Sequence, residues 1–352
     1  MKIKLRFIAL PALLIVPLLA ACGTYPASQS SLSPLSDGRY DSEFPYRSSS
    51  KQLEEISRSI KLVTSIGYYN SYIFDEEMKF TAADIKKTDL KSKASRTIYY
   101  NNTSSGTAIV IHSQGRHIAL LTCAHVVNFP DTVITYYYKE GGALSPFIQS
   151  ISVKVSQSNF VPDIPERGFV EILVMDVKND IALIGKTLNS VNSNFNIPEF
   201  SYPIGRAREL EWGDFVYVFG FPMNYKMISK GIVSSPDREG GKSFLIDAVF
   251  NRGFSGGAVL AIRDGVPNFE LVGLVRSVPA ESEYLLRPLV IEPDIEINPQ
   301  LPYKGDFAVE KRQSIKFGIT KVIGIEAVLE FFNDNRGIIE RKGFYINRLS
   351  GN

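Results

Sequence analysis

The feature that most limits the fold of this chain is a series of short β-type segments that begins near residue 95. Residues 107–111, 118–121, 169–174 and 271–275 are rich in aliphatic and aromatic side chains and are separated by turn residues. Short strands spaced this closely build all-β barrels or sandwiches rather than alternating strand–helix units. We therefore predict a mainly β fold, with one convincing helix late in the chain at residues 322–333.

Length and composition indicate a globular protein with room for two cores. The chain has 352 residues, of which 44% are hydrophobic and 22% are charged. A single hydrophobic core stops growing near roughly 250–300 residues. We therefore expect two domains or one two-lobed domain.

Cysteine and histidine are scarce, which limits the available chemistry. The two cysteines, Cys22 and Cys123, cannot form a disulfide framework or a four-thiolate zinc site. The three histidines are His112, His117 and His125, and they have no metal-ligand spacing. We therefore expect no metal and no cofactor, and any imidazole chemistry must use one of these three histidines.

The N-terminus carries a targeting pattern. Three basic residues precede an apolar run at 7–20, which is short for a membrane span and ends with Leu-Ala-Ala-Cys. This pattern resembles a bacterial lipoprotein signal. The resemblance implies cleavage of the signal peptide 1–21, lipid on the Cys22 sulfur and an acyl chain such as palmitate on its amine. An ordinary signal peptide or an uncleaved anchor is the alternative.

Residues 22–50 and 51–94 precede the β-rich region. Residues 24–50 contain nine serines and three prolines, so we predict a flexible tether over 22–50 that holds the body near a membrane. Gly23, in place of an aspartate, resembles the outer-membrane sorting pattern, which implies a lipid-anchored protein of the bacterial envelope facing the periplasm or cell surface. The extension 51–94 has apolar residues at helical spacing, which predicts a short amphipathic helix. The spaced residues are Leu53, Ile56, Ile60 and Val63.

The charge balance argues against a nucleic-acid partner. Removal of residues 1–21 takes away three positive charges and no acids, so the formal charge falls from +2 to 2 − 3 = −1. A nearly neutral protein lacks the broad basic surface that nucleic-acid binding uses.

Three residues form a candidate catalytic set. His125 follows an apolar run, Asp180 directly precedes another, and Ser255 lies between glycines. A serine hydroxyl is a weak nucleophile that needs a base beside it, and a histidine base needs a carboxylate to fix its tautomer. Flanking glycines allow a tight loop whose backbone N–H groups face a developing oxyanion. Asp176 is the alternative acid.

The order of these residues selects the scaffold. The segment Gly253-Phe254-Ser255-Gly256-Gly257 also fits the G-x-S-x-G elbow of α/β-hydrolases, but every histidine here precedes Ser255, whereas that fold needs its histidine afterwards. The order histidine, aspartate, serine, with gaps of 180 − 125 = 55 and 255 − 180 = 75 residues, is the chymotrypsin-like one.

Three motifs carry a family resemblance. The segments T-C-A-H at 122–125, D-I-A-L at 180–183 and D-A-V-F-N-R-G-F-S-G-G at 247–257 resemble those of trypsin-like serine proteases, closest to the HtrA (Deg) branch. The resemblance implies two six-stranded Greek-key β-barrels with a C-terminal helix. It spans a protease domain at 95–334, with barrel 1 about 95–190 and barrel 2 about 200–334.

The resemblance also implies roles for individual residues. His125, Asp180 and Ser255 would be catalytic, and the backbone N–H groups of Gly253 and Ser255 would form the oxyanion hole. The residue six before the serine, Val249, would line the substrate pocket and favour small or medium apolar side chains. Arg276 would instead favour an acidic side chain if it points inward.

Some features depart from the family pattern. Phe254 replaces the usual asparagine or aspartate, so activation by a freed N-terminal amine is not expected, and Arg252 replaces a common proline. The insert 279–314 is long and forms either a lid over the cleft or a surface loop. The C-terminal tail 335–352 is too short for a PDZ domain. Cys123 beside the histidine motif is expected to be a buried small hydrophobe.

Together these features predict a membrane-tethered serine endopeptidase that hydrolyses envelope or extracellular proteins, with protein or peptide substrates as partners and no nucleic acid. A catalytically silent trypsin-like fold that binds protein partners is the alternative. His112 and His117 flank a predicted hairpin turn at 113–116 and are expected on the solvated surface.

Overall fold

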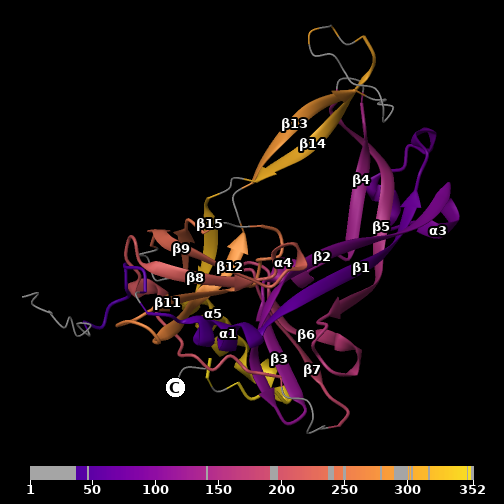
Figure 1. Cartoon of the computed structure of the whole chain (residues 1–352). Coiled ribbons are helices and arrows are strands. Elements are labelled where there is room, and N and C mark those ends of the chain that lie inside the picture. The colour runs from indigo at the N-terminus through magenta and orange to yellow at the C-terminus, as the bar shows by residue number, and fades with distance from the viewer. Residues whose placement is uncertain are drawn as a thin grey trace, which may run out of the picture. The chain divides into compact units, whose positions relative to one another are not determined.

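The computed structural model describes residues 37–349, apart from 46, 140–141, 191–196, 237–241, 249–250, 278–279, 289–299, 301, 303, 316–317 and 347 (Figure 1). The predicted signal peptide 1–21 and Cys22 lie outside the described residues. None of the helices in the described part of the chain is long and apolar enough to cross a membrane.

The first barrel is a closed ring of six antiparallel strands, because the first and the sixth of these strands in sheet order also pair with each other. A further strand, β4 (Thr132–Tyr138), extends the sheet beyond the ring through its pairing with β5. In ring order the six strands are β1 (Ile60–Ile73), β2 (Arg96–Gln114), β3 (His117–Thr122), β7 (Ile181–Thr187), β6 (Phe169–Asp176) and β5 (Leu144–Phe160).

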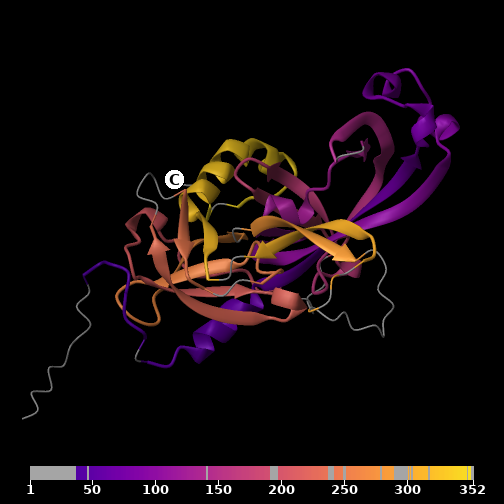
Figure 2. The same cartoon turned by 90° about the horizontal axis from the view of Figure 1, so that it is seen from above.

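The second barrel is also a closed ring of six strands, all paired antiparallel. The order is β10 (Ser243–Ile246), β15 (Thr320–Gly324), β12 (Phe269–Ser277), β11 (Ala258–Ile262), β8 (Phe215–Gly220) and β9 (Met227–Ser235). The helix α5 (Ile325–Arg341) follows and contacts β12 and β15 of this barrel and β6 of the first (Figure 2). Two six-stranded barrels followed by a helix confirm the predicted fold class.

Shorter elements lie between the strands. A two-stranded ribbon leaves the second barrel and occupies the predicted insert 279–314 (Figure 1); its strands are β13 (Ala280–Pro288) and β14 (Phe307–Ile315). The other α-helices are α1 (Ser50–Arg58), α2 (Ala82–Ile85), α3 (Leu90–Lys93) and α4 (Ala124–Val127). Single 3-10 turns are η1 (Glu76–Met78), η2 (Glu166–Gly168), η3 (Ala207–Glu209) and η4 (Pro222–Asn224).

The first barrel begins earlier than predicted. The expected start near residue 95 is wrong, because β1 lies in the supposed extension 51–94 and pairs with both β2 and β5. The amphipathic helix is present as α1 but ends at Arg58. Ile60 and Val63, which fit helical spacing in the sequence, are buried in β1 instead.

The predicted tether over 22–50 is too long, because its last residues pack on the second barrel. Tyr40 is buried, and its hydroxyl donates to Glu270 Oε2 at 2.7 Å. The guanidinium of Arg263 lies 4.0 Å from the centre of the Tyr40 ring, and the backbone of Asp41 hydrogen-bonds to Ile262 and Phe215. The described chain is therefore anchored to this barrel from about residue 40 onward.

The C-terminal boundary also differs from the prediction. The supposed tail 335–352 begins inside α5, which continues to Arg341. Phe344, Ile346 and Leu349 are buried in the core that both barrels share. These residues are therefore part of the folded body.

Candidate active site

His125 lies in the single-turn helix α4, directly after β3. Its neighbours Ala124, Val126 and Val127 are buried and fix the turn against the barrel, whereas the His125 side chain is 45% exposed. The buried side chains hold the helix in place and leave the imidazole accessible.

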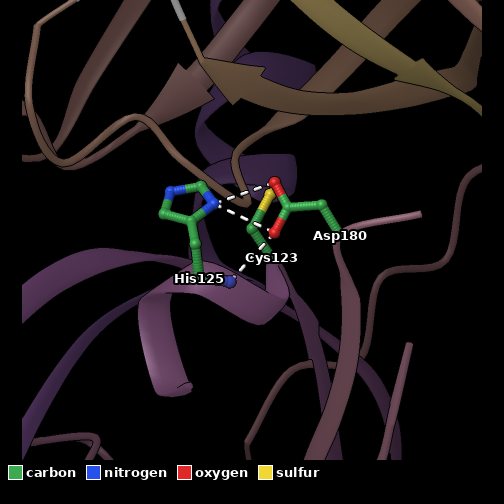
Figure 3. Close-up of side chains that lie close together, drawn as sticks. All are labelled: Cys123, His125 and Asp180. Atoms are coloured by element: carbon green, nitrogen blue, oxygen red, sulfur yellow. Dashed lines mark hydrogen bonds and ion pairs between the residues drawn. The ribbon is translucent and has the colours of Figure 1, made fainter. Parts of the chain in front are cut away.

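Asp180 lies directly before β7 and faces His125 (Figure 3). Its Oδ2 is 2.8 Å from His125 Nδ1, and its Oδ1 accepts a hydrogen bond from the His125 backbone N–H at 2.9 Å. The Asp180 carbonyl oxygen also accepts from the Ala124 N–H. Asp180 has φ 62°, in the left-handed region that Asp tolerates better than most residues. Side chain and backbone thus both join the aspartate to α4.

The environment keeps Asp180 ionised. Burial alone raises the pKa of this carboxyl, but the hydrogen bond and charge of His125, its backbone N–H and the Arg276 guanidinium outweigh burial and lower the pKa below its usual value. An ionised carboxylate beside Nδ1 fixes the imidazole tautomer with its proton on Nδ1, which leaves Nε2 as a base.

Ser255 lies in a tight loop before β11. Gly253 has φ 108°, and a Cβ there would lie 2.2 Å from the Phe221 carbonyl oxygen, so only glycine fits. Gly256 has φ 82° and is equally crowded, by the Thr107 carbonyl oxygen. Within the described residues, the backbone N–H groups of Gly253 and Ser255 have no hydrogen-bond acceptor. These are the two groups predicted to form the oxyanion hole.

Thr107 of β2, which the sequence analysis did not single out, fixes this loop from the first barrel. Its hydroxyl donates to the Gly253 carbonyl oxygen at 2.6 Å and accepts from the Phe221 N–H at 2.9 Å. Its backbone N–H donates to the Ser255 carbonyl oxygen at 2.7 Å. The serine loop of one barrel is therefore positioned by a buried threonine of the other.

Arg276, the second-last residue of β12, connects the two halves of the site. Its Nε lies 3.2 Å from Asp180 Oδ2, and its carbonyl oxygen accepts a hydrogen bond from Ser255 Oγ at 3.2 Å. Among the described residues, Ser255 Oγ makes this bond and none to His125. These contacts link His125, Asp180, Arg276 and Ser255 in one series. The Ser255 hydroxyl in it donates to the Arg276 carbonyl oxygen.

The other predicted site residues have varied positions. Val249 lies outside the described residues. Phe254 is buried, and its ring lies against Gly220. Asp176, the alternative acid, accepts hydrogen bonds from the backbone of Lys178 and Asn179 in an exposed turn. Its carboxylate serves that turn, and the carboxylate at His125 belongs to Asp180.

The two remaining histidines flank the hairpin turn between β2 and β3, where Gln114 pairs with His117. The expected surface position is wrong for His112, which is 6% exposed and whose pKa is lowered, mainly by burial. His117 is half-buried, with its ring edge against Phe344 and its Nδ1 3.2 Å from Thr187 Oγ1. Phe344 lies near both rings because the chain beyond α5 packs here.

Cys123 completes the cluster drawn in Figure 3. Its side chain is fully buried, and its Sγ donates to the Val275 carbonyl oxygen at 3.2 Å. Burial raises the pKa of the thiol well above its usual value, so the thiolate needed for nucleophilic attack or metal ligation is disfavoured. Possible ligand atoms of Cys123, His125 and Asp180 lie within 4.8 Å of one another, but all three residues use them in hydrogen bonds.

Comparisons with known proteins give one family model and solved structures to which this chain is similar. Residues 106–274 match the family model of the trypsin-like peptidase domain. A comparison with curated proteins finds no match. Among solved structures, "HtrA-type protease AlgW with tripeptide" has 15% sequence identity and a TM-score of 0.40, covering 83% of this chain; this chain spans 65% of its length. "Rv3671c protease, inactive form" has 14% identity and a TM-score of 0.36, with 66% of this chain and 83% of that chain covered.

Proposed function

Because residues 106–274 match the family model of the trypsin-like peptidase domain, we propose that the protein is a serine endopeptidase acting through Ser255, His125 and Asp180. The observation that carries this proposal is the 2.8 Å contact between His125 Nδ1 and Asp180 Oδ2, at a site where Arg276 contacts both Asp180 and Ser255. A buried carboxylate that fixes the histidine tautomer is the arrangement that activates a serine.

The proposed reaction is acyl transfer. Ser255 Oγ attacks the carbonyl carbon of the scissile bond while its proton passes to His125 Nε2. The negative charge that develops on the carbonyl oxygen is stabilised by the N–H groups of Gly253 and Ser255. The imidazolium then gives its proton to the leaving amine as the C–N bond breaks. Water, deprotonated by the same imidazole, hydrolyses the acyl-enzyme and regenerates Ser255.

This reaction requires a rearrangement of the described structure. The Ser255 hydroxyl donates to the Arg276 carbonyl oxygen and must leave this hydrogen bond so that its proton can face His125 Nε2. The hydrogen bond to Arg276 is also the observation that favours the alternative, a catalytically silent fold that binds proteins.

A fluorophosphonate probe separates the two functions. Such a probe forms a covalent bond with an activated serine, so soluble protein containing residues 23–352 should be labelled in the wild type and not in Ser255→Ala or His125→Ala. Ser156→Ala, at an exposed serine of β5, is the matched control and should label like the wild type. Unlabelled wild type with an intact fold would refute the peptidase proposal and leave the binding function.

We further propose that Cys22 is lipidated and tethers the enzyme to the bacterial envelope, where its substrates are envelope or extracellular proteins. The support is the lipoprotein-like pattern at 19–22. Full-length protein produced in bacteria should incorporate a palmitate analogue and partition into the detergent phase. Cys22→Ser should abolish both properties, whereas Cys123→Ser should leave them unchanged; incorporation that survives Cys22→Ser would contradict the tether.

A further inference from the structure

We infer that Arg276 is a positioning residue that holds the Asp180 carboxylate from the second barrel, so that its guanidinium acts on the catalytic pair and not on the substrate side chain. This inference rests on the proposed peptidase function. Its support is the contact between Arg276 Nε and Asp180 Oδ2 at 3.2 Å together with the fixed backbone from which the arginine side chain extends.

The residue before Arg276, Val275, is held by hydrogen bonds to two different segments. Val275 exchanges hydrogen bonds with the serine loop: its carbonyl oxygen accepts from the Gly256 N–H and its N–H donates to the Gly257 carbonyl oxygen, both at 2.8 Å. The Val275 carbonyl oxygen also accepts from Cys123 Sγ. Because Val275 is hydrogen-bonded both to the loop of Ser255 and to Cys123 near His125, the backbone from which the Arg276 side chain extends has a defined position.

The carboxylate of Asp180 needs such a partner. Its side chain is only 9% exposed, and burial disfavours the charged form. Within the described residues, the partners of Asp180 at ion-pair distance are His125 and Arg276. A histidine is charged only when it is protonated, so Arg276 is the permanent positive charge that compensates the buried carboxylate. A carboxylate compensated in this way stays ionised when the imidazole is neutral.

The position of Arg276 also predicts an effect on the imidazole. Among the described residues, the acidic and thiol groups that cluster with His125 are Asp180, whose charge favours the imidazolium, and Cys123, whose burial favours the neutral thiol. The guanidinium, on the far side of the carboxylate, offsets part of the negative charge and so opposes protonation of the imidazole. Loss of this charge should therefore move the acid limb of the pH–rate profile to higher pH.

The test compares Arg276→Met, which removes the charge, with Arg276→Lys, which retains it. We expect Arg276→Met to slow fluorophosphonate labelling about 10- to 100-fold, as for loss of a charged hydrogen bond, and to raise the midpoint of the acid limb by about 0.5–1 pH unit. Arg276→Lys should keep the acid limb of the wild type. Arg336→Met, at an exposed arginine of α5, is the matched control.

The double variant Arg276→Met/Asp180→Asn tests whether Arg276 acts through Asp180. If it does, adding Arg276→Met to Asp180→Asn should slow labelling less than the two single effects combined. Full additivity would overturn the inference. So would labelling of Arg276→Met at the wild-type rate with loss of cleavage only at acidic residues of a peptide mixture, because that result would assign Arg276 to the substrate pocket.

Histidine NMR gives a readout that does not need activity. The chain has three histidines, so ¹⁵N-histidine labelling gives few signals, and the His125 signals are those lost in His125→Ala. We expect the titration midpoint of His125 to rise in Arg276→Met and to stay in place in Arg276→Lys. An unchanged midpoint in folded Arg276→Met would overturn the inference, whereas failure of wild-type labelling would refute the peptidase proposal alone.

Discussion

The two barrels contribute to the site in different ways. The first barrel supplies both His125 and Asp180, which are joined by contacts of α4 with the residue before β7, and the second barrel adds Arg276 beside the carboxylate. The second barrel supplies Ser255 on a loop whose main contacts reach across to Thr107 of the first. The proposed base and its carboxylate therefore come from one barrel, whereas the loop of the proposed nucleophile depends on how the barrels fit together.

The barrels also differ in how much of each strand lies in the core. Strands β1, β2 and β5 of the first barrel have 14, 19 and 17 residues, whereas no strand of the second exceeds 9. Most of the first half of β2 is exposed and its second half is buried. The parts beyond the barrel form a separate small core around Phe74, Phe80, Ile148 and Ile151. The site lies at the buried ends, so the projecting parts can change without disturbing it.

The largest expected effect tests the pair within the first barrel. Asp180→Asn should lower the rate of labelling or turnover by about 10⁴, because an amide beside Nδ1 favours the wrong imidazole tautomer. Asp176→Asn, at the exposed neighbouring turn, is the control and should have little effect. Kinetics of probe labelling measure both variants, and the reverse ranking would assign the acid to Asp176.

The next effect tests the dependence of the serine loop on the first barrel. Thr107→Val keeps the shape but removes a hydroxyl that bonds both Gly253 and Phe221, which leaves two buried groups unpaired. We expect labelling to slow by about 10- to 100-fold and the melting temperature to fall. Thr135→Val, at an exposed pair on β4 and β5, should change neither, and equal behaviour of the two variants would remove the proposed role of Thr107.

A smaller effect concerns the stability of the second barrel away from the site. Asp214 is buried, and desolvation raises its pKa to about 6, well above the usual value for an aspartate. The folded state thus holds this proton more tightly, so stability from Asp214 is present below pH 4 and declines as pH rises through 6. Asp214→Asn should therefore raise the melting temperature at pH 8 by about 2 °C or more and give no gain at pH 4. A gain of the same size at both pH values would contradict this assignment, and Asp131→Asn is the exposed control.

The smallest effect concerns the thiol between the barrels. Cys123→Ser keeps a donor for the Val275 carbonyl oxygen, so labelling should slow by less than about tenfold. Thiol reagents should also leave labelling of the wild type intact, because the side chain is buried. Loss of activity comparable to that of Ser255→Ala would instead make Cys123 a participant in the reaction.

The short β-type runs predicted a mainly β fold, and the resemblance to trypsin-like proteases implied the two barrels and the grouping of His125 with Asp180. The sequence pattern missed β1 for a physical reason. Buried positions in β1 alternate through Val63, Ser65, Gly67, Tyr69 and Ser71, and three of these five side chains are small or polar. Side chains of β1 alternate between the two faces of the sheet, but hydrophobic and polar residues do not alternate with them, so the sequence lacks the usual period-two pattern of a strand.

The contacts of Thr107 and Arg276 were also beyond a sequence-based prediction. A threonine within a β-type run is ordinary for a strand, and only the closeness of the second barrel makes its hydroxyl a link. Arg276 ends an apolar run and was assigned to a substrate pocket, because the direction of a long side chain depends on partners from another barrel. Tyr40 was missed because the surrounding serines are typical of a tether.

The left-handed backbone at Asp180 limits which replacements evolution can test at this position. Only glycine, asparagine and aspartate adopt a positive φ readily, so a change to glutamate would add backbone strain to its longer side chain. Asparagine and glycine are therefore the replacements that this backbone conformation accepts readily, and both remove the carboxylate. A lineage that loses the acid at 180 would lose the proposed catalytic pair in a single step, which is a short path from the proposed peptidase to a binding protein.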